Sequence, residues 1–444
     1  MTHRDVELLA IGAGPANLAL AVALDETAPK DLAEGSLLVE RDATIAWQRG
    51  MLLPWTQSQV SFLKDFVTLR DPCSKFTFLN YLHSVGRLDD FINLGSFTPY
   101  RIELSGYLKW VAESLEKVRV ECNVACEAIE PCHDGDGTLS GWLTHLSNGS
   151  TVASKYLVLG AGRDPHVPPV LTGLPSHKVI HSTVYSQRIA ELRKDVAHRV
   201  VVVGGAQSAA EMFYSIQDEL PLCQPTMVMR SIGLNNYELS KFTNELYFPS
   251  FVDKFFNARP EARAQLLQEM YRSNYGGLTP SLLDALYRRM YLERLNGQER
   301  MRIITMVDIT AAREDGDDIV LELTDRRTGT IEELRCDVVL LGTGFARRMP
   351  RLVQSIASAL GIERIEVTRD YRLVVDGPAT AACYLQGVNE ATHGIADSLL
   401  SVLAVRAGEI ATDIVKHRDM TMPDHEATVL DDLIAPVGAV SIST

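Results

Sequence analysis

Short apolar runs that end at glycines recur along this chain, and each predicts a buried strand followed by a turn. The run at residues 8–11 enters the turn 12–14, and a helix-forming segment follows. Much later, four consecutive valines at 200–203 enter the turn 204–206, again ahead of a helix-forming segment. A strand, a glycine turn and a helix in this order point backbone N–H groups at a pyrophosphate. The pattern therefore predicts two dinucleotide-binding units.

The first unit has the residues that such a turn requires. Gly12 allows a sharp turn, Gly14 removes a side chain where a phosphate must approach, and Pro15 suits the first position of a helix. A second strand at 36–40 ends in Glu40, where a dinucleotide fold binds a ribose hydroxyl. An acid in a surface turn is the alternative interpretation of Glu40.

The second unit departs from the usual pattern at one position. Gly204 and Gly205 are present, but Ala206 stands where glycine normally lets phosphate approach the backbone, so we expect weakened nucleotide binding. The strand at 226–229 leads into Arg230. An arginine at this place favours a 2′-phosphate and hence NADPH over NADH.

The rest of the hydrophobic pattern predicts further helices and strands in alternation. It predicts helices at 101–115, 260–271, 280–292 and 396–415, and strands at 118–130, 142–146, 151–159, 302–304, 319–323, 337–341 and 383–386. Asn148 and Gly149 lie between two alternating runs, which indicates a hairpin turn rather than a glycosylation site. Pro165, Pro168 and Pro169 form a stiff crossing between domains.

The expected fold class is α/β, with two Rossmann-like dinucleotide-binding domains and a small helical insertion that binds substrate. The predicted division is 1–164 for the first part of the FAD-binding domain, 165–231 and 297–344 for the NADPH-binding domain, 232–296 for the insertion, 345–418 for the second part of the FAD-binding domain, and 419–444 for a polar, disordered tail.

Composition and charge exclude several classes of protein. A net charge of −14 argues against nucleic acid or an anionic membrane as partner. The chain has no apolar run long enough to span a membrane, and Asp5 and Glu7 interrupt any leader, so we expect a cytoplasmic protein. The spacing of Cys122, Cys126 and Cys132 fits no common zinc pattern, so the seven cysteines indicate reduced thiols and no metal is expected.

Lys64 stands inside an apolar run of the segment 47–82, which includes QVSFLKD at 59–65, and a lysine is unusual in such a run. It could extend its ammonium to water or pair with Asp65. It could also hold a substrate carboxylate.

Two dinucleotide units in one chain suggest FAD and NADPH bound side by side, an arrangement that supports hydride transfer to the flavin. A disulfide reductase would need a redox Cys-x-x-Cys motif, which the chain lacks. Transfer of one oxygen atom from a C4a-hydroperoxyflavin to a substrate is then the leading interpretation. A flavoprotein oxidase without hydroxylated product, or a flavin-binding regulatory relic, stays open.

From Val6 to about Lys416 the chain resembles the microbial N-hydroxylating flavoprotein monooxygenases, which oxidise the side-chain amine of ornithine or lysine for siderophore and related pathways. The motifs that carry the resemblance are 12–18 (GAGPANL), 62–65 (FLKD), 205–211 (GAQSAAE) and 393–401 (HGIADSLLS). Gln48, Ala206 and Phe345 depart from the family pattern, where His, Gly and Tyr are usual.

The resemblance implies a role for individual residues. Lys64 pairs with the amino-acid carboxylate, Asn244 also binds the head group, and Asn274 lines the pocket near the reacting amine and the nicotinamide ribose. The catalytic set is Gln59, Asn274 and Ser401. The implied cofactor contacts are Gly12, Gly14, Pro15, Asn17, Glu40, Trp47, Gln59, Leu399 and Ser401 for FAD, and Gly204, Gly205, Gln207, Ser208, Arg230 and Asn274 for NADPH.

The reacting amine must be neutral, although an alkyl ammonium has a pKa of about 10.4. Bringing it near neutrality requires roughly 3 pKa units, about 4 kcal/mol, which an apolar pocket supplies and a nearby carboxylate would oppose. Asn244 and Asn274 match the ornithine type, whereas the segment 277–282 leans towards the lysine type. L-Ornithine with O₂ is therefore the expected substrate pair, with lysine or a diamine as the alternative, and a homo-oligomer is left open.

Overall fold

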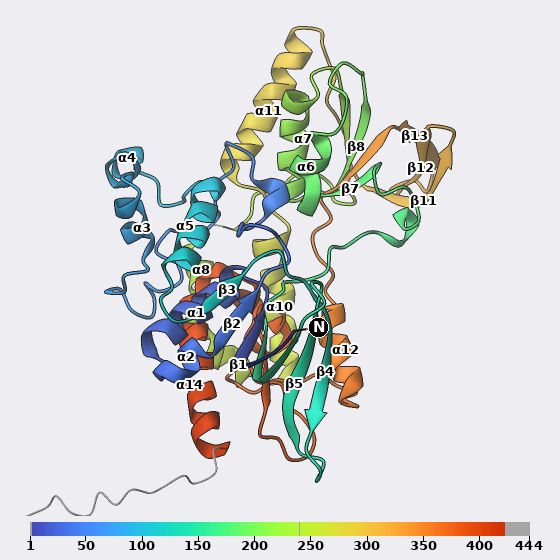
Figure 1. Ribbon diagram of the computed structural model, residues 1–444. Helices are drawn as coiled ribbons and strands as arrows, with labels where there is room; N and C mark the ends of the chain where they lie inside the picture. The colour runs from blue at the N-terminus through green and yellow to red at the C-terminus, as the bar shows by residue number, and fades with distance from the viewer. Residues whose placement is uncertain (1, 239, 422–444) are drawn as a thin grey trace, which may run out of the picture.

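The computed structural model describes residues 2–238 and 240–421, with the side chains of residues 272–274 outside the description. Two sheet-centred halves lie one above the other, and the chain passes between them more than once (Figure 1). This arrangement confirms the predicted α/β class with two Rossmann-like units.

The lower half contains a seven-stranded sheet in the order β3–β2–β1–β6–β5–β4, with β15 also pairing with β6. Its strands are β1 (His3–Ile11), β2 (Ser36–Val39), β3 (Arg119–Glu121), β4 (Cys126–His133), β5 (Leu139–Leu146), β6 (Thr151–Leu159) and β15 (Ala382–Leu385). β1, β2, β3, β6 and β15 are mutually parallel, whereas β4 and β5 pair antiparallel. The pairing of β15 with β6 makes one domain from both ends of the chain.

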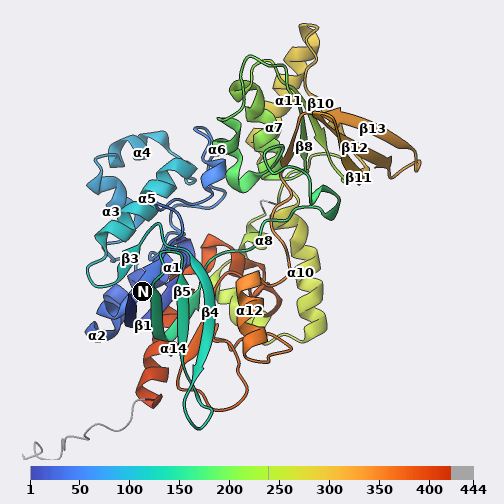
Figure 2. The same ribbon diagram turned by 45° about the vertical axis from the view of Figure 1, so that its right-hand side comes forward.

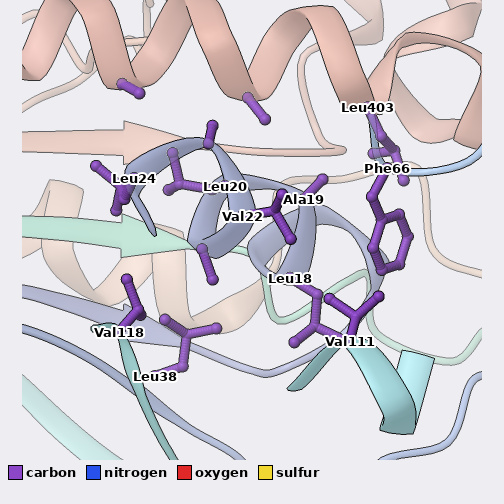
Figure 3. Close-up of a cluster of buried hydrophobic side chains, with 14 of the residues drawn as sticks. Leu18, Ala19, Leu20, Val22, Leu24, Leu38, Phe66, Val111, Val118 and Leu403 are labelled. Atoms are coloured by element: carbon purple, nitrogen blue, oxygen red, sulfur yellow. The ribbon is translucent and has the colours of Figure 1, made fainter. Parts of the chain in front are cut away.

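Helix α1 (Pro15–Thr27) forms the centre of this half. All of its residues from Asn17 to Asp25 are buried, because the sheet covers one side and α14 (Leu403–Thr421) and α5 (Arg101–Ser114) cover the others. Figure 3 shows Leu18, Leu20 and Leu24 of α1 within this core. A helix that is apolar all round is stable only in such a position.

The upper half contains a five-stranded parallel sheet in the order β10–β9–β8–β14–β7. Its strands are β7 (Val179–His181), β8 (Arg199–Val203), β9 (Gln224–Val228), β10 (Arg302–Ile304) and β14 (Val338–Leu341), and α7 (Gln207–Glu219) follows β8. Beside it stands a separate antiparallel sheet of β11 (Val307–Asp315), β12 (Asp318–Asp325) and β13 (Ile331–Cys336).

The helices of the segment 232–296 are divided between the two halves. They are α8 (Lys241–Glu245), α9 (Val252–Phe256), α10 (Pro260–Tyr275) and α11 (Pro280–Leu295). Val252 of α9 and Met270 of α10 join a buried cluster with Ile395 of the lower half, the flavin half, where the sequence predicts FAD. Leu282 and Leu286 of α11 join the core of the upper half, the NADPH half, where the sequence predicts NADPH. Figure 2 shows α10 beside the lower half and α11 beside α7.

The other elements are short. They are α2 (Lys30–Glu34), α3 (Phe78–Ser84), α4 (Leu88–Leu94), α6 (Tyr185–Ile189), α12 (Arg351–Ala359) and α13 (Glu390–His393), with single 3₁₀ turns η1 (Arg49–Met51), η2 (Pro169–Leu171), η3 (Ser182–Val184), η4 (Pro249–Phe251), η5 (Ile395–Ser398) and η6 (Leu400–Val402).

Two predicted elements are wrong in their extent. The strand expected at 118–130 is two strands, β3 and β4, because Asn123 turns the chain with a φ of 62° between them. The helix expected at 396–415 begins only at Leu403 and is preceded by η5 and η6. Because α14 extends to Thr421, the first residues of the predicted tail 419–444 are helical, and its residues 422–444 lie outside the described residues.

Candidate active site

The first glycine turn lies between β1 and α1, at the carboxyl edge of the parallel strands. Gly12 has a φ of 91° and its N–H donates to the carbonyl of Val39 at 2.8 Å. A side chain at Gly14 would meet no protein atom within 4 Å, so the space beside its backbone is open. Pro15 is the first residue of α1. The turn therefore has the open cradle at a helix N-terminus that a pyrophosphate requires.

Asn17 holds this turn from inside. Its Nδ2 donates to the carbonyls of Ile11 and Gly12 at 2.9 and 2.7 Å, and its Oδ1 accepts from Gln386 Nε2 at 2.8 Å. A Cβ at Gly160 would lie 2.4 Å from Asn17 Oδ1, which explains why that position is glycine. The Asn17 side chain is fully buried, so it shapes the turn through the backbone.

Glu40 lies beside the same turn. One carboxylate oxygen accepts the N–H of Ala13 at 2.8 Å, and the other accepts the N–H of Asp42 at 3.1 Å. The half-buried carboxylate is thereby fixed next to the open cradle.

The second glycine turn lies between β8 and α7. Gly204 has a φ of 137°, and a Cβ there would lie 2.5 Å from the carbonyl oxygen of Gly342. A Cβ at Gly205 would lie 3.0 Å from Ser231 Oγ. Ala206 precedes α7 with ordinary extended backbone, so its methyl group causes no strain. The methyl group of Ala206 would therefore weaken binding only by keeping a phosphate away from the backbone of this turn.

Gln207 and Ser208 form the first turn of α7. The Gln207 amide donates to Glu211 at 2.8 Å and accepts the N–H of Thr279 at 3.0 Å. Arg230 lies exposed directly after β9, next to the Ser231 hydroxyl that faces Gly205. Gln207 and Ser208 therefore begin the helix that follows this turn, and Arg230 follows the neighbouring strand β9.

Lys64 meets Ser401 across the two parts of the flavin half. Its Nζ donates to Ser401 Oγ at 3.1 Å and lies 4.5 Å from the centre of the Phe248 ring. Burial lowers the pKa of the Lys64 ammonium. The structure contradicts the pairing with Asp65, because the Asp65 carboxylate accepts from Thr68 and from the backbone of Val67 and Phe78.

Asn244 and Asn274 lie on two different helices of the insertion. Asn244 is exposed on α8, one turn before Phe248. Asn274 lies on α10, and its side chain is outside the described residues. The adjacent Tyr275 contacts the hydroxyl of Ser398 at 2.9 Å and donates to Glu390. The end of α10 therefore contacts Ser398, which precedes Ser401 by three residues in the sequence.

The other predicted residues occupy the same half. Trp47 is half-buried against the α1 core, and its backbone N–H donates to Ser105 Oγ at 3.2 Å. Gln59 is exposed in the loop that leads to Lys64, and Leu399 is half-buried beside the cluster of α9 and α10. Among the described residues, no hydrogen bond joins the Gln59 side chain to Lys64. Leu399 contributes an apolar side chain.

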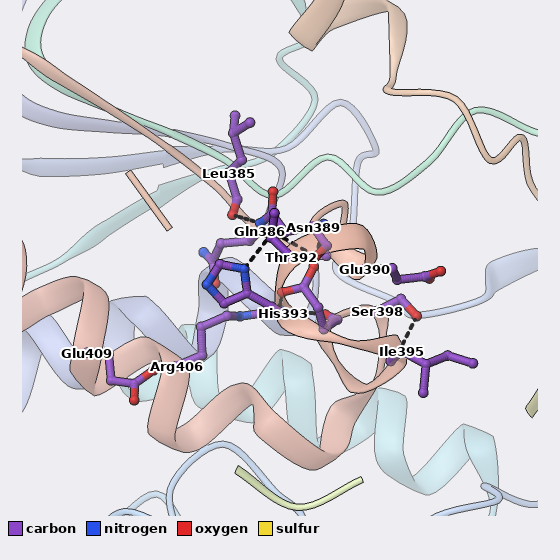
Figure 4. Close-up of polar contacts among 12 residues, drawn as sticks. Leu385, Gln386, Asn389, Glu390, Thr392, His393, Ile395, Ser398, Arg406 and Glu409 are labelled. Atoms are coloured by element: carbon purple, nitrogen blue, oxygen red, sulfur yellow. Dashed lines mark hydrogen bonds and ion pairs between the residues drawn. The ribbon is translucent and has the colours of Figure 1, made fainter. Parts of the chain in front are cut away.

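The segment 395–401 is held by a buried polar group (Figure 4). Arg406 donates to Asp397 at 2.8 Å, and the other Asp397 oxygen accepts the N–H of Asn389 at 2.7 Å. His393 stacks on Tyr371 at 4.1 Å, and burial lowers its pKa. These contacts tie Asp397, four residues before Ser401, to α14 and to the segment that follows β15.

Two sets of residues were missed by sequence reasoning. Phe248 and Tyr275 lie beside residues that were assigned, and only the packing of the insertion reveals their contacts. Arg101 and Glu211 form a buried ion pair between the two halves. Glu211 stands in the motif 205–211, but nothing in the sequence indicates its partner.

The donor set fits two dinucleotides. The cradle at Gly14 is open, and Gln386 Oε1, beside Asn17, is a buried oxygen without a hydrogen-bond partner in the described part of the chain. In the described ranges, no cluster of three His, Cys, Asp or Glu side chains could hold a metal ion. None of the helices between residues 2 and 421 is long and apolar enough to cross a membrane.

Two glycine turns, each at the carboxyl end of parallel strands in one of two sheets, define a protein that binds two dinucleotides. Comparison with known proteins narrows this class to one family. The model of the L-lysine 6-monooxygenase/L-ornithine 5-monooxygenase family matches residues 4–347. The L-ornithine N(5)-oxygenase of Arthrobotrys oligospora is 36% identical over 430 residues, covering 92% of this chain and 88% of that protein. This chain belongs to the L-lysine 6-monooxygenase/L-ornithine 5-monooxygenase family.

Solved structures agree with this assignment. The ornithine hydroxylase of Pseudomonas aeruginosa is 33% identical with a TM-score of 0.86, covering 93% of this chain and 99% of that one. The ornithine N-hydroxylase of Kutzneria sp. 744, in a structure with reduced FAD, NADP⁺ and L-ornithine, is 32% identical with a TM-score of 0.87, covering 93% and 100%.

Proposed function

We propose that this protein hydroxylates the N5 amine of L-ornithine, using FAD, NADPH and O₂. One oxygen atom forms the new N–O bond and the other leaves as water, with two electrons from NADPH and one proton completing the balance. The observation that carries the proposal is the half-buried Lys64 ammonium, which Ser401 and Phe248 hold beside α8. An amino-acid carboxylate is the ligand that complements such a cation.

The two glycine turns divide the cofactors between the halves. FAD fits the turn of Gly12 and Gly14, where Glu40 would bind the ribose, and NADPH fits the turn of Gly204 and Gly205, where Arg230 would bind the 2′-phosphate. When bound, FAD supplies the redox chemistry, taking a hydride from NADPH and reacting with O₂. The sheets hold the two turns rigidly, so the protein contributes orientation.

The substrate residues follow from the same geometry. Lys64 anchors the carboxylate, and Asn244 on α8 contacts the amino-acid head group. Asn274 on α10 lines the path to the reacting amine, with Gln59 and Ser401 on the flavin side. The reacting nitrogen must lose its proton, so we expect no carboxylate within hydrogen-bonding reach of it.

Ornithine is preferred over lysine and the diamines for two reasons. The relatives described above act, by name, on ornithine. A diamine has no carboxylate for Lys64 to bind, and lysine is one methylene longer, which a fitted pocket discriminates by about 1–3 kcal/mol.

The product supplies a hydroxamate precursor of the siderophore type. The acidic chain and its seven unpaired cysteines fit a reducing compartment, and the proposal therefore places the reaction in the cytoplasm.

The test measures NADPH consumption and hydroxylamine formation together, across ornithine, lysine, putrescine and cadaverine. With ornithine we expect nearly one hydroxylamine for each NADPH consumed. NADPH consumption with all four amines but no hydroxylamine would identify an oxidase instead. A failure to bind NADPH at millimolar concentration would favour a regulatory relic.

A further inference from the structure

A buried ion pair joins the two halves of the molecule at the base of the second glycine turn. Arg101 begins α5, and its two terminal nitrogens donate to the two carboxylate oxygens of Glu211 on α7, each at 2.7 Å. The side chains are only 6% and 1% exposed. Arg101 lies with the flavin core and Glu211 with the NADPH core, so this contact crosses the domain boundary.

Stability alone does not explain this pair. A buried ion pair can often be replaced by apolar side chains without loss of stability, because taking two charges out of water is costly. A cation at the N-terminus of a helix such as α5 is also disfavoured by the helix dipole. The bidentate geometry, in contrast, fixes both the distance and the angle between the two helices.

The Glu211 carboxylate also accepts a hydrogen bond from the first residue after the second glycine turn. Glu211 Oε1 also accepts from Gln207 Nε2 at 2.8 Å, and Gln207 Oε1 accepts the N–H of Thr279 at 3.0 Å. Gln207 is the first residue of α7, directly after Ala206, and Thr279 precedes α11. One chain of hydrogen bonds therefore connects the flavin half, the second glycine turn and the helical insertion.

The surrounding contacts leave this joint little freedom. A Cβ at Gly50 would lie 2.3 Å from the carbonyl oxygen of Ser182, so the backbones of the two halves touch there. Trp55 of the flavin half donates to Ser215 Oγ at 3.2 Å and packs edge-on against Tyr214. The ion pair is the buried charged contact of this joint, and the hydrogen bonds of Trp55 with Ser215 and of Ser186 with the Arg49 carbonyl lie beside it.

We propose that Arg101 and Glu211 are positioning residues, which act through Gln207 to aim the nicotinamide dinucleotide turn at the flavin. The proposal rests on the NADPH and FAD assignments of the proposed function, and it does not depend on ornithine as substrate. A small misplacement of reacting groups costs about 100-fold in rate, so the effect should appear in hydride transfer.

The test uses the holoenzyme with Arg101→Met and Glu211→Leu combined, which replaces the pair with apolar groups of similar size. We expect retained FAD, a melting temperature close to or above that of the wild type, and anaerobic flavin reduction by NADPH slowed about 10- to 100-fold. The amide of Thr279 should exchange with deuterium faster, and reduction by dithionite should be unchanged. Arg199→Met with Asp337→Asn, an ion pair at the other end of β8, is the matched control.

Flavin reduction within about twofold of the wild-type rate in the folded double variant would overturn the proposal. If the double variant does not fold, Arg101→Lys decides, because lysine keeps the charge but cannot bind Glu211 bidentately. Normal reduction in Arg101→Lys would then also overturn it. A wild type that reduces its flavin but forms no hydroxylamine would contradict the proposed function alone.

Discussion

Lys64 is the side chain on which recognition of the substrate carboxylate depends. Replacing Lys64 with Met removes the cation but keeps the apolar stem that packs near Phe248. A hydrogen bond to a charged group contributes about 1.5–3 kcal/mol, so kcat/KM for ornithine should fall about 10- to 100-fold. Steady-state hydroxylamine assays check this, with Lys75→Met, an exposed lysine paired with Glu116, as the control. An equal loss with putrescine, which has no carboxylate, would contradict the assignment.

The lowered pKa of Lys64 predicts a pH dependence specific to amino acids. The ammonium binds a carboxylate only while it is protonated, and burial brings its loss of charge below the ordinary value of 10.5. The kcat/KM for ornithine should therefore fall on the alkaline side before pH 10.5 is reached, whereas the value for putrescine should lack this limb. pH profiles of the two amines measured side by side distinguish these outcomes.

At the scale of elements, the turn before α7 departs from the usual glycine pattern at Ala206, and a single substitution can restore that pattern. Ala206 has ordinary extended backbone, so glycine can replace it without structural change. If its methyl group keeps the phosphate away from the backbone, Ala206→Gly should lower the Kd of NADP⁺ several-fold while FAD content stays the same. Titration calorimetry of the holoenzyme measures the difference, and an unchanged Kd would mean that the nucleotide clears the methyl group. Gly135 is exposed between β4 and β5, its φ is not positive, and a Cβ there would meet no protein atom within 4 Å, so Gly135→Ala is a control for the reverse exchange.

Elements with a local signal could be predicted from the sequence. The strand, turn and helix around Gly12, the valine strand β8 and the hairpin at Gly149 depend on neighbouring residues alone, and they are found as expected. The break at Asn123 could not be predicted, because a single residue with positive φ interrupts an apolar pattern that otherwise continues. The start of α14 could not be predicted for another reason: the 3₁₀ turns η5 and η6 before it bury side chains in a pattern similar to that of an α-helix.

The residues of the candidate site could also be predicted only where a local pattern marks them. Lys64 attracted attention because lysine is rare in an apolar run, and its neighbour Ser401 follows from the motif 393–401. The pair of Arg101 and Glu211 was hidden, because no local pattern records which of many charged residues meet across a domain boundary. Contacts between distant segments depend on how the cores assemble, and they become visible only in three dimensions.

At the scale of the whole molecule, buried histidines occur in both halves. His181 lies at the end of β7 and its Nε2 donates to the carbonyl oxygen of Gly344, His393 stacks on Tyr371, and His417 of α14 contacts Tyr156. Burial lowers the pKa of all three. The unfolded chain therefore binds protons more strongly than the folded chain near pH 6.5, and the free energy of unfolding must decrease as the pH falls through this value.

This effect should be measurable as a fall in melting temperature between about pH 7.5 and 5.5, with each histidine contributing about 1.4 kcal/mol for every unit by which its pKa is lowered. Asp65 and Glu103, whose pKa values burial raises, act in the opposite direction but only nearer the carboxyl range. His393→Gln keeps an amide that can bind the Arg369 carbonyl and cannot titrate, so its melting temperature should fall less steeply than that of the wild type. His83→Gln, at an exposed position of α3, should follow the wild type. Equal slopes for all three proteins would mean that His393 is charged in the folded state, and that its stacking on Tyr371 tolerates the proton.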